Sequence, residues 1–261
     1  MPGLLCVWAN LPDDAITWYE DEWLPDMREQ NSIHTLHSQY TTNGFEGEPI
    51  GQLDSPWPWC AVYDVPDVRK ATEACYNNRN FPPEEMLAGP LKTARFDTKT
   101  YKELRRWQNG GWNGDPTQIG SVTLMEWRAL KDKEQEILHW YTTYLAPQVS
   151  SSDQVLRFRL FELDNATVLE GTEHSTTEKD ALHTYFTAVE FDTEDWPWEY
   201  VIALAENEKW REYFEGQKEV IWQISHYLVK KCYTEAGVFD IDKDVSSDES
   251  PPGSSAGPSS G

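Results

Sequence analysis

The chain has 261 residues, of which 39% are hydrophobic and 13% aromatic, enough for one large or two small globular domains with a buried core. Its formal net charge is −23, and such a surface repels phosphate backbones and anionic lipid headgroups. This argues against nucleic acid and membranes as partners. The 13 tryptophans and 12 tyrosines can fill a core or line a pocket for an apolar ligand.

The cysteines and the apolar runs bear on where the protein works. The four cysteines form no CxxC pair and no tight cluster, so neither a zinc site nor a disulfide framework is indicated. Residues 4–9 are apolar but too short for the hydrophobic region of a signal peptide. No apolar run reaches the ~18 residues of a membrane span. We therefore expect reduced thiols and a cytoplasmic location.

Apolar runs and helical spacing predict the elements of the first half of the chain. Residues 4–9 have the length and composition of a strand. A helix follows, in which Ile16, Tyr19, Trp23 and Met27 recur at helical spacing. In chain order, the remaining predicted elements are strand 33–40, strand 60–65, helix 67–76 and strand 92–101.

The second half is predicted to repeat this order. Its elements are strand 121–127, a helix around residues 137–145, strand 155–163, strand 199–204, helix 206–214 and strand 219–229. Two echoes support a repeat: WYEDEWLP (18–25) matches WYTTYLAP (140–147), and WPW occurs at 57–59 and again at 196–198. Because the echoes keep their order, we interpret the halves as a tandem duplication. The proline that closes each WY echo is expected to end or kink its helix.

This order of elements, strand-helix-strand-strand-helix-strand, is the βαββαβ unit of ferredoxin-like folds. Each unit has one sheet face covered by its helices and one bare face that must be buried. We therefore predict an α+β protein in which two tandem ferredoxin-like units form an intramolecular dimeric α/β barrel of eight strands. The protein would be a monomer, in which the two units pair with each other as an internal pseudo-dimer, or a weak homodimer. The predicted boundaries are an N-terminal unit 1–110, a joint 111–118, a C-terminal unit 119–233 and a disordered acidic Ser/Pro/Gly tail 234–261.

The WY echoes resemble a motif of the dimeric α/β-barrel superfamily, aromatic-aromatic-x-x-x-His-x-Pro on the first helix of the unit. Within this superfamily, the chain most resembles EthD-like proteins, which include small fungal enzymes of polyketide and terpenoid pathways. This resemblance implies an enzyme for apolar, polycyclic, oxygenated substrates, commonly working without a metal. Trp23 and Leu145 occupy the position of the family's histidine, so that acid/base residue is not carried over.

Histidines and aromatic residues of the first half provide the candidate site. His34 and His37 lie three residues apart on a predicted strand, so they point to opposite faces and cannot share a metal. We predict one cavity between the sheet and the helices of the N-terminal unit, with no cofactor. The predicted catalytic residues are His34, His37 and Tyr40, and the predicted substrate-binding residues are Trp8, Trp23, Trp57, Tyr63 and Asp97.

Charged residues also occur inside predicted strands. Glu126 lies among apolar neighbours, and Arg157 and Arg159 alternate with apolar residues and so face one side. A buried charge needs a partner, so we expect these arginines to project to the barrel seam and to pair across it with Glu or Asp.

The predicted function is a cofactor-independent enzyme of secondary-metabolite (terpenoid or polyketide) biosynthesis that acts on a small apolar polycyclic substrate. Cyclisation or cycloaddition is the favoured reaction and decarboxylation the second. An aromatic cavity that holds a reactive conformer, with donors that polarise a carbonyl, can catalyse such reactions. The alternative is a non-catalytic ligand-binding or stress-response protein with the same barrel. The chain has no GxSxG, Walker or HExxH motif, which weakens the hydrolase, nucleotide-binding and zinc-protease classes.

Overall fold

The computed structural model describes residues 1–41, 57–77, 81–176, 182–195 and 198–241. Its long strands are β1 (Gly3–Asn10), β2 (Thr35–Thr41), β3 (Trp59–Val65), β4 (Arg95–Gln108), β5 (Ser121–Ala129), β6 (Val155–Glu170), β8 (Tyr185–Phe191) and β9 (Val220–Thr234). They are antiparallel and follow the order β9-β2-β3-β1-β4-β6-β8-β5, and β5 pairs with β9 again. The sheet is therefore a closed eight-stranded barrel, and the predicted α+β class is confirmed.

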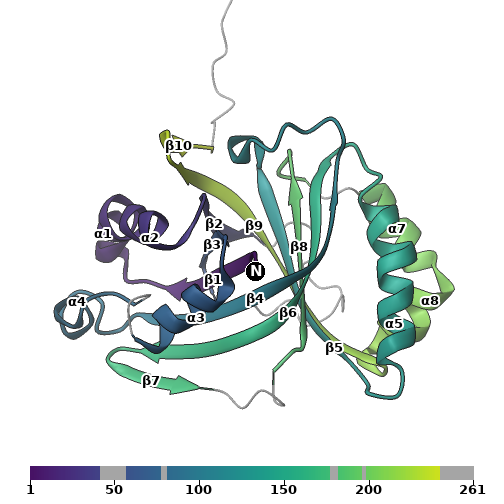
Figure 1. The fold of residues 1–261 in the computed structure, drawn as a ribbon, viewed down its shortest axis with the longest axis horizontal. Coiled ribbons are helices and arrows are strands. Elements are labelled where there is room, and N and C mark those ends of the chain that lie inside the picture. Colours follow the sequence, from purple (N-terminus) through teal and green to yellow (C-terminus); the bar gives the residue numbers. More distant parts are fainter. Residues whose placement is uncertain (42–56, 78–80, 177–181, 196–197, 242–261) are drawn as a thin grey trace, which may run out of the picture.

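Short helices lie outside this barrel. Those of the first half are α1 (Ile16–Trp18), the π-helical turn η2 (Tyr19–Trp23), α2 (Leu24–Asn31), α3 (Val68–Tyr76) and α4 (Glu84–Ala88). Those of the second half are α5 (Glu134–Trp140), the π-helical turn η4 (Tyr141–Leu145), α6 (Ala146–Val149), α7 (Trp198–Glu206) and α8 (Glu208–Tyr213). Single 3-10 turns occur at η1 (Asp13–Ala15), η3 (Pro116–Gln118) and η6 (Glu215–Gln217). The helices of the first half cover one side of the barrel, and α5, α7 and α8 cover the other (Figure 1).

The two halves have the same strand arrangement. The first half has the order β4-β1-β3-β2 and the second has β9-β5-β8-β6, so each places its fourth, first, third and second strand side by side. The halves meet at two seams, β4 with β6 and β2 with β9. Both halves thus show the βαββαβ order of a ferredoxin-like unit. The tandem duplication and the unit boundaries stay predictions.

The WPW echo does not mark equivalent elements. Trp59 begins β3, as expected, whereas Trp198 begins helix α7. Residues 199–204 are therefore helical, and our prediction of a strand there is wrong. The third strand of the second half is β8, which lies earlier in the chain. A short apolar run does not distinguish a buried strand from a helix, and this one contains the helix formers Glu, Leu and Ala.

The WY echo, in contrast, marks the same local structure twice. The N–H of Leu24 bonds to the carbonyl of Tyr19, and the N–H of Ala146 bonds to that of Tyr141. These five-residue spacings define a π turn directly before each proline. A proline removes one helical N–H and crowds the preceding turn, and the wider π turn accommodates this. Neither helix therefore ends at its proline.

The barrel wall is buried on both faces. Along β1, the even-numbered residues 4–8 face the barrel interior, and the odd-numbered residues 5–9 face the helices of the first half. A third core lies between the second half of the sheet and its helices. Strand β1 consequently reads as an almost continuous apolar run, because neither of its faces meets water.

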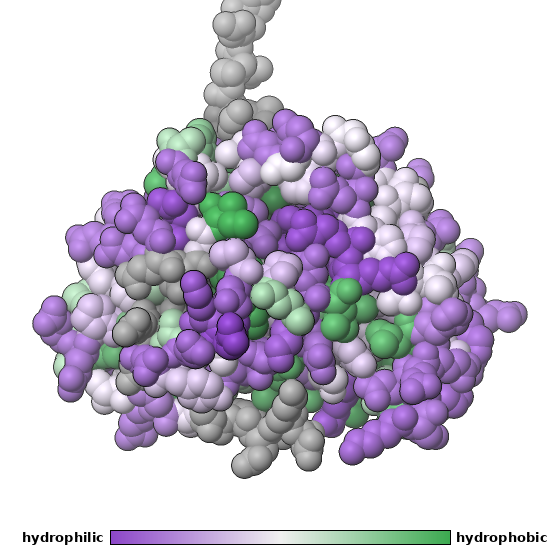
Figure 2. Space-filling model, viewed as in Figure 1, coloured by the Kyte–Doolittle hydropathy of each residue, from purple (hydrophilic) through white to green (hydrophobic). Residues whose placement is uncertain are grey.

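The chain beyond the barrel forms a small hairpin. Strand β10 (Gly237–Asp240) pairs with the end of β9, so residues 234–240, which we placed in the tail, are folded. The rest of the predicted tail, 242–261, lies outside the described residues. No described helix is both long and apolar enough to cross a membrane. On the face seen in Figure 2, hydrophilic side chains predominate and the hydrophobic ones form small separate groups.

Candidate functional site

The predicted site residues fall in three places rather than one. Between the sheet and the helices of the first half lie Trp23, His37 and Tyr63. In the barrel or at its rim lie Trp8, Tyr40, Trp57 and Asp97. His34 belongs to an ion-pair network of the barrel. The single cavity that we expected behind Trp8, Trp23, Trp57 and Tyr63 is therefore not formed. Its walls face opposite sides of the sheet, since successive side chains of a strand alternate.

The group that we call the His37 cluster consists of Tyr19, Glu20, His37, Trp59, Tyr63 and Lys231. The His37 ring stacks on Trp59, with 4.8 Å between ring centroids, and lies 5.9 Å from the ring of Tyr19. Its Nε2 lies 3.2 Å from Oε1 of Glu20. The other oxygen of Glu20 lies 2.7 Å from Nζ of Lys231.

Two irregularities of the backbone meet at this cluster. Tyr19 and Glu20 belong to the π turn η2, and β2 shifts its register against β9 between His37 and Ser38. Both π turns and β-bulges are enriched beside functional sites, where they redirect side chains. The predicted opposite orientation of the two histidines is confirmed, since His37 faces the helices and His34 faces the barrel side with Asp64.

Several polar atoms of the cluster are buried without hydrogen bonds. Within the described residues, the hydroxyls of Tyr19 and Tyr63 and both ring nitrogens of His37 have no partner with hydrogen-bond geometry, although the two phenols lie near enough to influence each other's pKa. The contact between His37 and Glu20 has the distance but not the alignment of a hydrogen bond. His37 and Tyr63 are both 0% exposed. Because buried polar groups are almost always paired with protein or ordered water, these four atoms leave hydrogen-bonding capacity in one place for water or for polar atoms of a ligand.

Burial also sets the charge states of the cluster. It lowers the pKa of His37, although Glu20 opposes this, so the ring is neutral at neutral pH. Contact with His37, together with Lys231, lowers the pKa of Glu20 to about 2. Burial raises the pKa of Tyr19 and of Tyr63, which stay protonated. The cluster thus contains a neutral imidazole that can accept a proton and two phenols that can donate hydrogen bonds.

A second polar group lies inside the barrel, around Lys99. Its Nζ is 2.8 Å from Glu126 and 3.2 Å from Asp97, and the hydroxyl of Tyr101 donates to Glu126. Trp8 packs against it, with the Lys99 ammonium 5.0 Å from the ring centroid. Burial raises the pKa of Asp97, one of whose oxygens has no hydrogen-bond partner within the described residues. The group is largely an internally paired ion cluster.

A third polar group joins both halves further along the barrel. Arg157 and Arg159 both bind Glu190, and both contact Asp64. The expected pairing of these arginines across the barrel seam is confirmed for Asp64, which belongs to the first half, whereas Glu190 lies on the neighbouring strand β8 of the same half. His34 lies 3.8 Å from Asp64, and burial lowers its pKa. This network neutralises its own charges, which is the usual condition for burying them.

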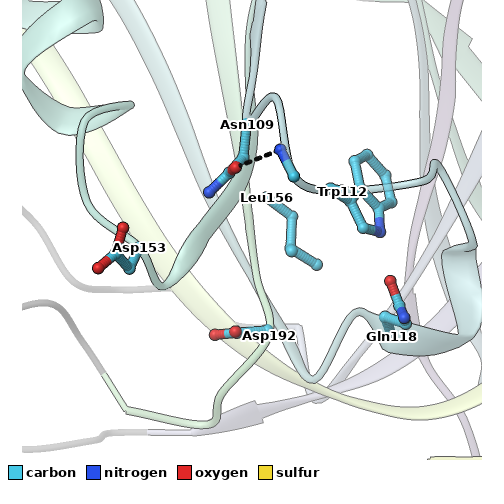
Figure 3. A pocket seen from close by; sticks show the side chains of 7 residues that line it. Asn109, Trp112, Gln118, Asp153, Leu156 and Asp192 are labelled. Carbon is cyan, nitrogen blue, oxygen red and sulfur yellow. Dashed lines mark hydrogen bonds between the residues drawn. The ribbon is translucent and has the colours of Figure 1, made fainter.

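Two cavities open near the joint between the halves. One, of about 510 Å³, is lined by Asn109, Gly111, Trp112, Gln118, Asp153, Leu156 and Asp192. Figure 3 shows these side chains around an open space, with the side chain of Asn109 accepting a hydrogen bond from the backbone of Gly111. The other, of about 520 Å³, is lined by Ile33, His34, Gly114, Asp115, Pro116, Thr117, Thr234, Glu235, Ala236 and Phe239. His34 is the predicted catalytic residue that borders a described cavity.

Metal binding has no support in the part of the chain that the structure describes, where no group of three or more His, Cys, Asp or Glu side chains could hold an ion. The four cysteines are buried and form no disulfide with one another. Burial raises the pKa of the Cys6 and Cys60 thiols, so they are poor nucleophiles at neutral pH.

Comparisons with known proteins define the class of fold. No protein-family profile matches the sequence, and no curated protein matches it. The chain is similar to the solved structure of a "putative monooxygenase" from Fusobacterium nucleatum subsp. nucleatum, with a TM-score of 0.52 and 9% identity over 92% of this chain and 96% of that one. It is also similar to an anthrone oxidase-like protein, with a TM-score of 0.51 and 8% identity over 88% of this chain and 92% of that one.

At this identity the likeness shows the fold alone, a closed eight-stranded barrel whose two halves each have the βαββαβ order. The predicted barrel fold is therefore confirmed, while membership of the dimeric α/β-barrel superfamily and of its EthD-like group stays a prediction.

Sequence reasoning missed several members of the His37 cluster. Tyr19 and Glu20 stand in the first WY echo, where the resemblance to the family marks only the position of its histidine, Trp23. Trp59 lies in the WPW echo, beside the predicted Trp57. Lys231 carries no local signal, because its proximity to His37 arises from a seam between strands almost 200 residues apart.

Proposed function

We propose that the chain is an enzyme that acts on an apolar, polycyclic substrate bearing a hydroxyl or keto group, which binds at the His37 cluster. The observation that carries this proposal is the set of buried polar atoms without hydrogen bonds in Tyr19, His37 and Tyr63. His37 takes a proton from the substrate's hydroxyl group, or from the carbon next to its carbonyl. Tyr19 and Tyr63 donate hydrogen bonds to the oxygen on which negative charge develops.

The environment suits each of these roles. A general base works best when it is unprotonated at the working pH, and burial keeps His37 neutral. Preorganised donors stabilise a developing oxyanion most where water is excluded. The half-buried rings of Trp18, Trp23 and Trp59, which pack against this core, offer flat surfaces for a polycyclic substrate.

The names of the two similar structures fit this reading. Monooxygenase and anthrone oxidase both describe oxidation of a small molecule, and proton removal from a polycyclic ketone gives an electron-rich enolate that reacts readily with oxygen. Secondary-metabolite biosynthesis is the process we favour for such a substrate. Cyclisation and decarboxylation, predicted from the sequence, remain alternative outcomes of the same proton transfer and carbonyl polarisation.

The test uses hydroxylated anthrones and related polycyclic ketones as probes, with absorbance and oxygen consumption as readouts of turnover. The His37→Gln variant should lower kcat/KM on the order of 100-fold, the usual contribution of a general base. Tyr19→Phe and Tyr63→Phe should each lower it by about the same factor, as expected for loss of an oxyanion donor. Tyr141→Phe, the matching tyrosine of the second WY echo, is the control and should keep full activity. Undiminished turnover in His37→Gln would reject this site.

The second candidate function is non-catalytic binding of the same class of ligand. It is favoured by the large indole content near the cluster, which serves binding without any chemistry. Quenching of tryptophan fluorescence by a probe that is never turned over, with weaker quenching in Trp59→Ala, would support this alternative over the enzyme.

A further inference from the structure

We propose that Lys231, contributed by the second half of the chain, is a positioning residue of the His37 cluster: it holds Glu20 beside His37 and balances the charge of that carboxylate, so that the ring remains free to accept a proton. This inference rests on the proposed role of His37 as a base. It makes the site dependent on both halves, although all the residues that we predicted for catalysis lie in the first.

The geometry of the β2–β9 seam carries the inference. His37 and Lys231 lie directly opposite each other in the register of β2 and β9, where the bulge follows His37. The carboxylate of Glu20 spans the pair, with one oxygen 2.7 Å from Nζ of Lys231 and the other 3.2 Å from Nε2 of His37. Tyr233, two residues along β9, donates a hydrogen bond to the backbone carbonyl of Glu20. Strand β9 thus fixes Glu20 at two points.

The charges around His37 show why Glu20 needs a counter-charge there. The helical segment presents Glu20 and Asp21, and β10 presents Asp240, which lies opposite Lys231 in the β9–β10 register. Strand β3 contributes Tyr63, and β9 contributes Lys231 and Tyr233. A carboxylate beside an imidazole favours the protonated ring, which cannot act as a base. Lys231 opposes this by attracting the same carboxylate and by repelling a proton on the ring.

Removing the charge of Lys231 and removing the charge of Glu20 should shift the pKa of His37 in opposite directions. Lys231→Met leaves the Glu20 carboxylate uncompensated, so the pKa of His37 should rise by about one pH unit. Glu20→Gln removes the group that favours the protonated ring, so the pKa of His37 should fall. A residue that only supports packing would not produce shifts of opposite sign.

The experiment is an NMR titration of the histidine ring protons in the full-length protein without substrate. The His37 signal is identified by its loss in His37→Gln. Lys231→Arg keeps the charge and should titrate like the wild type. Lys209→Met is the matched control, because Lys209 also pairs with glutamates but lies in the second half, at Glu136 and Glu212. Where Lys231→Met is poorly folded, Lys231→Gln and Glu20→Gln give the same comparison.

The outcomes separate this inference from the proposed function. An upward shift in Lys231→Met with a downward shift in Glu20→Gln supports the inference. Unchanged titration in both variants overturns it, even if His37 is the base. The acidic limb of the kcat/KM profile should move with the same sign and size. If the ring titration moves while that limb stays in place, Lys231 controls His37 but His37 is not the catalytic base.

Discussion

The two helix–sheet layers of this protein use the same helix type but treat their polar groups differently. In the first half, Tyr19 follows a tryptophan into a π turn, and its hydroxyl has no hydrogen-bond partner within the described residues. In the second half, Tyr141 occupies the same place in the motif, and its hydroxyl is paired with Thr187 at 2.6 Å. The indole N–H of Trp127 donates to the same threonine.

Three further ring donors of the second layer are also paired. The Tyr185 and Tyr213 hydroxyls donate to Glu134 and Glu136, and the Trp222 indole donates to a backbone carbonyl. Paired buried groups stabilise a layer, whereas buried groups without protein partners cost stability that a bound ligand or water can restore. The two layers therefore share a helix type and a strand order but differ in whether their buried hydroxyls are hydrogen-bonded. The experiments below test this difference, from the largest expected effect to the smallest.

Replacing Thr187 by valine should break the second layer. The change keeps the shape of the side chain but leaves the Tyr141 hydroxyl and the Trp127 indole buried without a partner. At about 1–3 kcal/mol for each buried group left unpaired, we expect a loss of about 2–6 kcal/mol in the free energy of unfolding. Urea denaturation measures this. A loss below about 1 kcal/mol would show that the second layer is not held by these bonds.

Acidification should destabilise the protein through buried histidines of both halves. Burial lowers the pKa of His226 to about 4, against about 6.5 in an unfolded chain. Between these values the unfolded chain binds a proton that the folded chain does not, so stability is complete above pH 6.5 and falls toward pH 4. This residue alone accounts for about 3 kcal/mol.

Denaturation of wild type and His226→Asn at pH 7 and at pH 4 measures this contribution. The variant should lose less stability than the wild type over this interval, and the exposed His139→Gln serves as control. Burial lowers the pKa of His34 and His37 too, so part of the acid sensitivity should remain in the variant. Equal losses in the variant and the wild type would contradict the assignment.

Removing the unpaired hydroxyls of the first layer should have the smallest effect on stability. Tyr19→Phe and Tyr63→Phe delete groups that are already buried without partners, so the folded state loses no hydrogen bond. We expect changes within about 0.5 kcal/mol or a slight gain, because the cost of burying each hydroxyl disappears. Thermal unfolding compares them with Tyr141→Phe, which should be less stable. Large losses in the first-half variants would mean that these hydroxyls have protein partners after all.

The sequence predicted the order of elements better than the place of the site. The WY echo correctly identified one helix type used twice, because aromatic spacing and a fixed proline act within a few residues. The WPW echo misled us, since Trp59 begins a strand and Trp198 begins a helix. The alternation of side chains along a strand correctly placed His34 and His37 on opposite faces. The same alternation contradicts our prediction that Trp8 and Tyr63 line one cavity. Those two rings face opposite sides of one sheet.

By itself, the sequence determined the features that depend on near neighbours: apolar runs that form strands, helical spacing, two WY helices and charges that need partners. The tertiary structure alone decided which of these features meet. It closed the barrel through the seams β2–β9 and β4–β6, and it set Lys231 opposite His37 with Glu20 between them. The reason is physical. Strand register across a closed barrel is fixed by simultaneous pairing on both edges and by burial on both faces, and a local stretch of sequence encodes neither.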